Sequence, residues 1–191
     1  MRLFVGVTLA GEIRLAAAAT ARELQRRLDS GVRAAWVQPD KMHLTVRFIG
    51  HVDDARVAAI VDGLEAPLRL APFDVVLSGC GAFPSTGPPR VFWIGLSEGF
   101  ASLRAMHDEF NRRLRPFGFE AEERRYSAHL TLARVKDIPR ESVRTTRGVL
   151  AALHVPPARC RVDHATVFQS RLSAKGATYV PLAEVPFEQL G

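Results

Sequence analysis

The sequence predicts an α+β fold of two pseudo-symmetric lobes, each an antiparallel sheet with helices on its outer face, around a central cleft. The phrase HLTV at residues 43–46 returns 86 positions later as HLTL. A strand and a long helix precede each phrase, and matching phenylalanines lie 39 positions before the first histidine and 37 before the second. The segments lack the strict βαβ order of a parallel sheet, which favours two related antiparallel halves.

The first half is expected to begin with a buried strand over residues 2–10 and a helix of good helix formers over 11–31. Residues 34–39 resemble a short strand that ends at a proline. Residues 41–52 are rich in β-branched and aromatic residues, so a strand carries the first phrase. Aspartates followed by apolar residues at helical spacing predict a helix over 53–70.

The second half repeats this order. A strand over residues 73–83 leads into a loop rich in glycine and proline at 84–89. The further elements are a strand over 90–96, a helix over 98–118, a strand over 128–135 with the second phrase, a helix over 139–153 and a hairpin of 161–170 with 177–185. No clear linker separates the halves, so we expect residues 1–191 to form a single bilobal domain.

Composition favours a globular, cytoplasmic protein with an anionic partner. Hydrophobic residues make up 47% of the chain, and the net charge is +6. Such a basic balance favours nucleic acid or nucleotides. No apolar run approaches the length that spans a membrane, and two cysteines in a chain of 191 residues indicate reduced thiols rather than a disulfide framework.

The repeated phrases place reactive side chains on one face of their strands. Alternation along a strand points His43 and Thr45 to the same side, with the aliphatic residues on the other, and the same holds for His129 and Thr131. If the halves face each other, all four side chains converge on one cleft. One neutral histidine then accepts a proton from an attacking water while the other, protonated, gives a proton to a leaving oxygen of a bound phosphate. From the residues alone, these two roles are interchangeable.

A third His-x-Thr, at residues 164–166, lacks the leucine and the matching context, so we expect His164 to be a solvated or packed strand residue. The other histidines and the cysteines lack the spacing of a metal site, and the glycines of 79–87 are not followed by Gly-Lys-Ser/Thr. We therefore expect no metal and no cofactor.

Paired His-x-Thr phrases on a duplicated chain of this length resemble the 2H phosphoesterases, and within them the RNA 2',3'-cyclic phosphodiesterase (2'-5' RNA ligase) family. The resemblance runs through RLFVGVTL, HLTVRFIG, RVFWIGL, HLTLARV and VFQSRLSAKGATYVPL. It implies hydrolysis of RNA 2',3'-cyclic phosphate ends to 2'-phosphomonoesters, with reversible 2'-5' joining of some tRNA halves. It also implies that His43 is the proton donor and His129 the proton acceptor. Ala128 departs from the family, which often has proline there.

Four further residues are candidates for substrate binding. Phe48 and Arg134 each lie five positions after their histidine. We expect phosphate contact by Arg134, whereas Phe48 is a candidate either for base stacking or for packing in the core. An odd offset reaches the cleft face only if a bulge or strand end intervenes. Arg47 has the parity of His43 and is expected to line the cleft, unless it is simply solvated. Tyr126, with Arg125, is a candidate for the rim that holds RNA, although such charged stretches are usually only solvated.

Two other functions remain open beside hydrolysis of RNA 2',3'-cyclic phosphate ends. One is an RNA-binding module that uses the cleft for capture without turnover. The other is a phosphodiesterase of small cyclic or 2'-5' linked nucleotides. In each case we expect a monomer.

Overall fold

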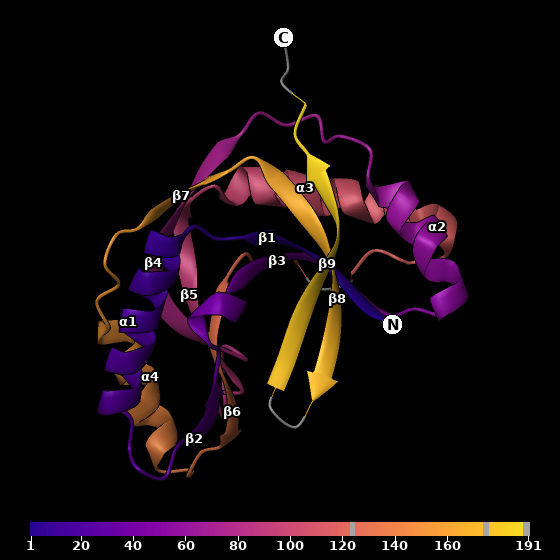
Figure 1. Cartoon of the computed structure of the whole chain (residues 1–191). Helices are drawn as coiled ribbons and strands as arrows, with labels where there is room; N and C mark the ends of the chain where they lie inside the picture. The colour runs from indigo at the N-terminus through magenta and orange to yellow at the C-terminus, as the bar shows by residue number, and fades with distance from the viewer. Residues whose placement is uncertain (123–124, 174–175, 189–191) are drawn as a thin grey trace.

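The strands that carry the two phrases, β3 (His43–His51) and β6 (Leu130–Asp137), lie side by side in the middle of one antiparallel sheet. The computed structural model describes residues 1–122, 125–173 and 176–188. Within these ranges the sheet has nine strands, in the order β7-β4-β5-β6-β3-β1-β8-β9, with β2 paired to β6 (Figure 1). The other strands are β1 (Arg2–Thr8), β2 (Arg33–Trp36), β4 (Phe73–Phe83), β5 (Val91–Glu98), β7 (Arg159–Val162), β8 (His164–Ser173) and β9 (Gly176–Pro186). The helices are α1 (Gly11–Arg27), α2 (Asp54–Leu64), α3 (Phe100–Leu114) and α4 (Ser142–Ala152), with short 3₁₀ turns at Pro39–Lys41 and Arg115–Phe117.

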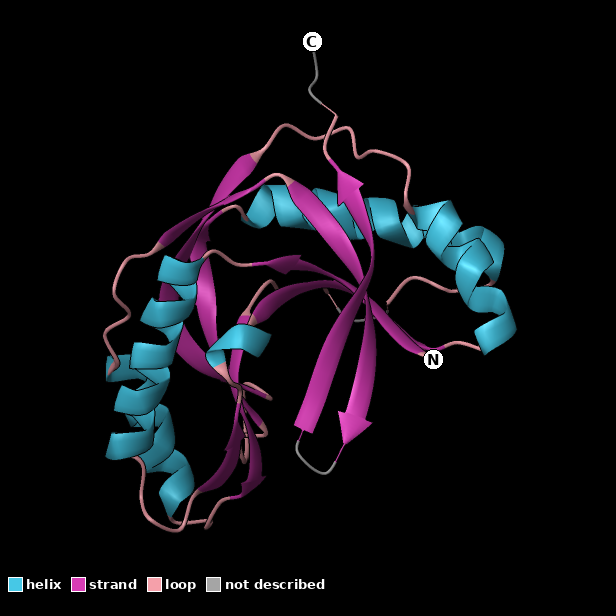
Figure 2. Ribbon diagram, viewed as in Figure 1, coloured by secondary structure: helices cyan, strands magenta, loops and turns pink. Residues whose placement is uncertain are grey.

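The join between β3 and β6 divides the sheet into two lobes. The first lobe consists of β3, β1, β8 and β9, and the second of β6, β5, β4 and β7 with β2. The long helices cross over: α1 follows β1 but packs on β6 and β7, and α3 follows β5 but packs on β3. Figure 2 shows the resulting pairs, α1 beside α4 and α2 beside α3. Each lobe is thus covered by a helix from the other half of the chain, which ties the lobes together.

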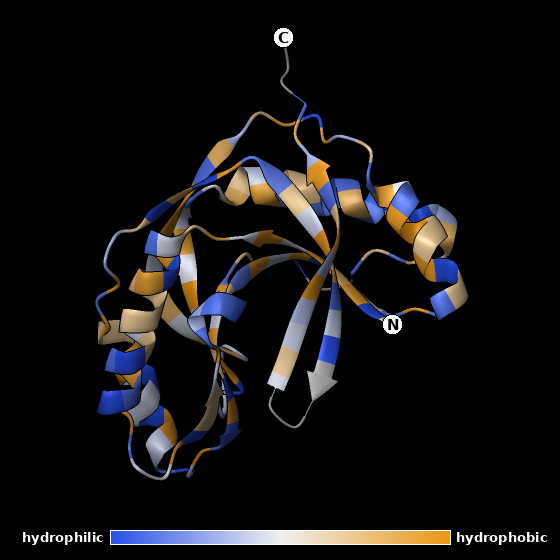
Figure 3. Cartoon of the chain, in the orientation of Figure 1, coloured by the Kyte–Doolittle hydropathy of each residue, from blue (hydrophilic) through white to orange (hydrophobic). Residues whose placement is uncertain are grey.

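Apolar residues fill the space between the sheet and the helices, and they alternate with polar residues along most elements (Figure 3). On α3 the fully buried side chains recur every three or four positions, which gathers them on the one face that meets the sheet. These residues are Leu103, Met106, Phe110 and Leu114. The two cysteines are free thiols, and burial raises the pKa of Cys80 to about 12. No helix among the described residues is long and apolar enough to cross a membrane.

The predicted α+β fold is confirmed. Two predicted elements differ from those of the structure, each for a local reason. The helix predicted over residues 53–70 ends at Leu64, because Pro67 cannot continue a helix and restricts the residue before it. The strand predicted over residues 161–170 is instead two strands, β7 and β8. They separate because β7 pairs with β4 in the second lobe while β8 pairs with β1 in the first.

The contact that joins the lobes gives a stability prediction. Leu44→Ala, at a fully buried position on the β3–β6 join, should lower the free energy of unfolding by about 2–5 kcal/mol, from lost burial and a residual cavity. Urea denaturation followed by circular dichroism measures this change. The control is Leu182→Ala, at a side chain that is 36% exposed, which should change stability by less than about 1 kcal/mol. Equal effects of the two substitutions would contradict the central place of the join.

Candidate active site

The two phrases meet through their leucines. Leu44 pairs with Leu130 across β3 and β6, and both side chains are fully buried. In an antiparallel pair with this register, His43 lies opposite Thr131 and Thr45 opposite His129. All four of these side chains are half-buried, on the face opposite the leucines. The structure therefore brings together the four residues that strand alternation predicted to converge.

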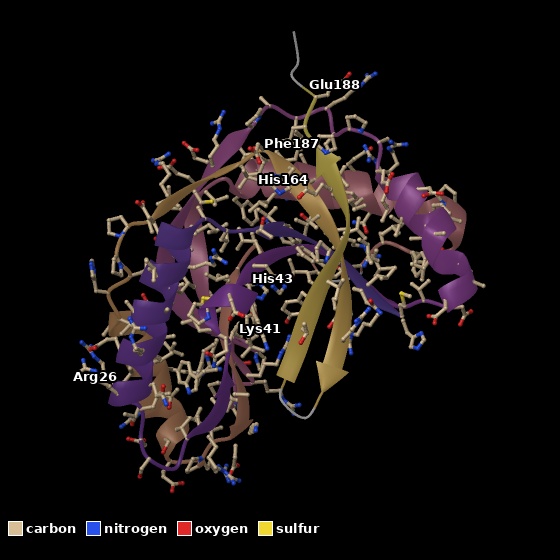
Figure 4. The ribbon with its side chains drawn as sticks, viewed as in Figure 1. Arg26, Lys41, His43, His164, Phe187 and Glu188 are labelled. Carbon is tan, nitrogen blue, oxygen red and sulfur yellow. The ribbon has the colours of Figure 1, made fainter. Side chains whose placement is uncertain are left out.

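Both histidines are held by the backbone in the same way. Nδ1 of His43 lies 2.9 Å from the carbonyl oxygen of Lys41, and Nδ1 of His129 lies 2.7 Å from that of Ser127. A carbonyl oxygen can only accept, so each Nδ1 donates its hydrogen. Each ring then leaves Nε2 for proton transfer. Figure 4 shows His43 beside Lys41 near the centre of the molecule, whereas His164 lies apart near Phe187.

The surroundings of the histidines favour their neutral forms. Burial lowers the pKa of His43 and of His129, and the hydrogen bond to the backbone carbonyl opposes this effect at both. The positive charge of Arg134 lowers both pKa values further. His129 also lowers the pKa of His43, so the two rings interact electrostatically. An anionic phosphate between them would reverse the effect of Arg134 and allow one ring to hold a proton.

A matching bulge in each central strand redirects the residues beyond the phrases. The register between β1 and β3 skips Val46, and the register between β5 and β6 skips Leu132, each the fourth residue of its phrase. At each bulge two consecutive residues are buried. Beyond it the side chains again alternate between the two faces of the sheet, but each position faces the side opposite to the one that strict alternation from the histidine predicts. Phe48 and Arg134 are consequently exposed on the cleft side. The bulge that their odd offset required is therefore present at both positions.

The same bulge shows that the expectation for Arg47 is wrong. Its side chain is only 6% exposed and points away from the cleft, because the parity changes at Val46. The guanidinium pairs with the carboxylate of Glu122 at 3.1 Å and donates to the carbonyl oxygen of Glu120 at 2.6 Å. Arg47 therefore anchors the segment that precedes the second phrase and does not itself line the cleft.

Tyr126 belongs to that anchored segment. Its hydroxyl donates to the carbonyl oxygen of Thr45 at 3.1 Å, and its ring stacks on His107 of α3 with centroids 4.6 Å apart. Burial raises the pKa of the phenol, which stays protonated at neutral pH. The position of Tyr126 beside the first phrase agrees with its predicted place at the rim, but its hydroxyl is bound to the protein.

A cavity of about 990 Å³ opens from the site on the side of His129. It extends from Thr45 and His129 to the exposed ring of Phe48 and to Arg125. Its full lining is Thr45, Val46, Phe48, Phe83, Pro84, Arg90, Val91, Glu122, Arg125, Tyr126, Ser127 and His129. Of the predicted residues, His43, Thr131 and Arg134 lie outside this lining, although the charge of Arg134 reaches both histidines. No group of three or more His, Cys, Asp or Glu within the described ranges is placed to hold a metal ion.

Sequence reasoning missed the aromatic residues around each histidine. The ring of His43 lies 4.8 Å from Phe4 and 4.7 Å from Tyr179, measured between centroids. The ring of His129 lies 4.9 Å from Phe83 and 6.5 Å from Trp93. Phe4 and Trp93 lie on strands next to the phrases, which strand pairing makes foreseeable. Tyr179 comes from the C-terminal hairpin; the segment VFQSRLSAKGATYVPL that contains it carries part of the family resemblance, but its contact with His43 was not predicted.

Comparison with known proteins gives consistent matches along the chain. A family model described as LigT-like phosphoesterase matches twice, over residues 13–93 and 94–179, in agreement with the predicted duplication. An RNA 2',3'-cyclic phosphodiesterase of Thermotoga maritima is 31% identical over 189 residues, covering 98% of this chain and 96% of the relative. A protein of the same name from Aeropyrum pernix is 34% identical over 160 residues, covering 82% and 88%.

Solved structures share the fold. TT0787 of Thermus thermophilus is 25% identical, with a TM-score of 0.77 and 98% coverage of both chains. Escherichia coli LigT complexed with 3'-AMP gives a TM-score of 0.74 at 21% identity, also with 98% coverage of both chains.

The influence of Arg134 on both histidines leads to a prediction about pH dependence. Arg134→Gln removes a positive charge, so the pKa values of His43 and His129 should rise. Any activity that requires a neutral histidine as base should then show its acidic limb at a higher pH than in the wild type. NMR titration of the imidazoles and the pH profile of kcat/KM measure the two shifts. Unchanged imidazole titrations in the variant would contradict the assigned proximity.

The buried pair of Arg47 leads to a second prediction. Arg47→Ala should lower the free energy of unfolding by about 2–3 kcal/mol, because it removes the ion pair with Glu122 and the hydrogen bonds to the carbonyl oxygens of Phe48 and Glu120. The partial exposure of Glu122 and its remaining contact with His107 limit the loss. It should also raise KM, since the wall of the cavity loosens. Arg104→Ala, which removes an exposed pair with Asp108, is the control and should change stability by less than about 0.5 kcal/mol.

Proposed function

The chain belongs to the LigT-like phosphoesterase family, and from this premise we propose that it hydrolyses 2',3'-cyclic phosphates at RNA ends to 2'-phosphomonoesters. It is a phosphodiesterase, as the shared name of its relatives supports. The observation that carries the proposal is the matched pair of histidines, each with Nδ1 bound to a carbonyl oxygen and with Nε2 left for the substrate.

In the proposed reaction the two histidines act on opposite sides of one phosphorus. Nε2 of His129 accepts a proton from water as the water oxygen bonds to phosphorus. The bond from phosphorus to the ribose 3'-oxygen breaks, and Nε2 of His43 gives that oxygen a proton. The assignment of donor and acceptor follows the family, since the backbone holds both rings alike. Each general acid or base typically contributes about 10²–10⁴-fold to the rate.

The remaining polar groups stabilise the charge on the phosphate. The hydroxyls of Thr45 and Thr131 lie on the same face as the histidines and are proposed to donate to its non-bridging oxygens. Arg134 is proposed to balance the negative charge that grows as water adds. The position of Thr45 is supported by the hydrogen bond from Tyr126 to its carbonyl oxygen.

The substrate is RNA or a nucleotide, and the cavity beside His129 suits part of an RNA chain. Phe48 is 38% exposed there. The guanidinium of Arg2 lies over one face of its ring at 4.8 Å, so we propose that a base stacks on the other face, and such stacking is typically worth about 1–3 kcal/mol. Arg125 at the cavity rim is available for the backbone. We propose RNA ends, tRNA halves among them, as substrates, and reversible 2'-5' joining when an RNA hydroxyl replaces water. We also propose that the protein is cytoplasmic, which the two free thiols support, and that it acts as a monomer.

A phosphodiesterase of small cyclic or 2'-5' linked nucleotides is the second candidate. It is favoured by the LigT structure that contains 3'-AMP. A comparison of kcat/KM for adenosine 2',3'-cyclic phosphate with that for an oligonucleotide ending in the same group separates the two candidates. RNA as the substrate predicts the higher value, and a steeper dependence on salt, for the oligonucleotide.

The proposed function is tested by incubating the protein with an RNA that ends in a 2',3'-cyclic phosphate, in EDTA, and identifying the product by mass spectrometry and ³¹P NMR. We expect a 2'-phosphate, and a fall in kcat of at least about 10²-fold for His43→Ala and for His129→Ala. His164→Ala, at a histidine paired with Asp163 away from the site, is the matched control and should keep full activity. Turnover that is lost in EDTA would contradict the two-histidine mechanism, and a 3'-phosphate product would contradict the assigned leaving oxygen. Binding of the RNA without turnover would favour the capture module.

A further inference from the structure

The two lobes differ at their outer edges. In the first lobe β9 pairs with β8 along its whole length, from Gly176 to Pro186. In the second lobe the outer strand β7 has four residues and pairs with Phe73–Val76, at the end of β4 away from Phe83. Tyr179 of β9 lies on the His43 side of the cleft, and the cavity opens on the His129 side.

This asymmetry places Tyr179 of β9 against His43. The two rings meet edge to face, with centroids 4.7 Å apart and planes at 76°. Tyr179 also meets Phe4 edge to face at 5.3 Å, and Phe4 in turn lies against His43. The ring is half-buried between the hairpin and the central strands, so its position is fixed on two sides.

The positive charge of Arg134 relates Tyr179 to the proposed phosphate site. The positive charge of Arg134 acts on the phenol of Tyr179 as it does on His43 and His129. Arg134 therefore lies within electrostatic range of all three rings. Burial raises the pKa of Tyr179 more than Arg134 lowers it, so the hydroxyl keeps its hydrogen at neutral pH and remains a donor.

We propose that Tyr179 is a further substrate-contacting residue, whose hydroxyl donates a hydrogen bond to a non-bridging oxygen of the phosphate beside Arg134. The inference rests on the proposed function, because it uses the same phosphate site. A fixed donor in a partly buried site stabilises the transition state more than the ground state, as charge accumulates on the non-bridging oxygens. The other tyrosine cannot serve this purpose in the same way, since the hydroxyl of Tyr126 donates to Thr45.

The test is Tyr179→Phe, which keeps the ring against His43 and removes only the hydroxyl. With adenosine 2',3'-cyclic phosphate as substrate, we expect kcat to fall about 10- to 100-fold, with a smaller change in KM and an unchanged melting temperature. Thr178→Val, which removes an exposed hydroxyl from the neighbouring position on the other face of β9, is the matched control and should behave as the wild type. A Tyr179→Phe variant with wild-type kcat and KM would overturn the proposal.

Binding of adenosine 2'-monophosphate, measured by calorimetry, separates this proposal from the proposed function. If the wild type hydrolyses no cyclic phosphate but binds the monophosphate, the proposed function fails, and Tyr179 is judged by binding alone. Affinity that is weakened by Tyr179→Phe and unaltered by Thr178→Val supports the contact. Equal affinity of Tyr179→Phe and the wild type overturns it.

Discussion

The pairing of Leu44 with Leu130 determines which side chains can reach a shared phosphate. Both leucines are fully buried at the join of the lobes, and burial of a leucine side chain is worth about 1.5–3 kcal/mol. A slip of one residue in either strand would turn the leucine of that strand toward the cleft and its histidine into the core. The hydrophobic core therefore fixes the register, and the register fixes the distance between the two His-x-Thr phrases. Packing and chemistry depend on the same four-residue segment in each strand.

The bulge in each strand extends this control beyond the phrases. It turns the fifth residue after each histidine to the cleft face, whichever residue stands there. In β3 that residue is Phe48 and in β6 it is Arg134, so the same backbone device presents an aromatic ring on one side and a cation on the other. A duplicated backbone thus gives a site whose two ends differ in chemistry, as an asymmetric substrate requires.

The sequence was informative wherever a pattern repeats. Alternation predicted the common face of His43, Thr45, His129 and Thr131, and matched spacing predicted the two lobes. The bulge position was not predictable, because it depends on how β1 and β5 pair with the central strands. Because the position of the bulge was unknown, Arg47 was predicted to lie on the wrong face of the strand. For Phe48, a place on the cleft face was predicted only on the condition that a bulge was present. The contact of Tyr179 with His43 was also beyond reach, because it depends on the C-terminal hairpin returning to the first lobe.

Two histidines in identical surroundings would have no reason to take different protonation states. Here the backbone partners match, so the difference must arise from what surrounds the rings. His43 lies beneath Phe4 and Tyr179, whereas His129 borders the open cavity. His129 faces the cavity, which suits its proposed role of accepting a proton from water, and the more enclosed ring of His43 suits its proposed role of giving a proton to the leaving oxygen. The influence of His129 on the pKa of His43 adds to the separation, since a proton on one ring disfavours a proton on the other. The long C-terminal hairpin on one lobe, and the short β7 on the other, therefore supply the asymmetry that two copies of one phrase cannot.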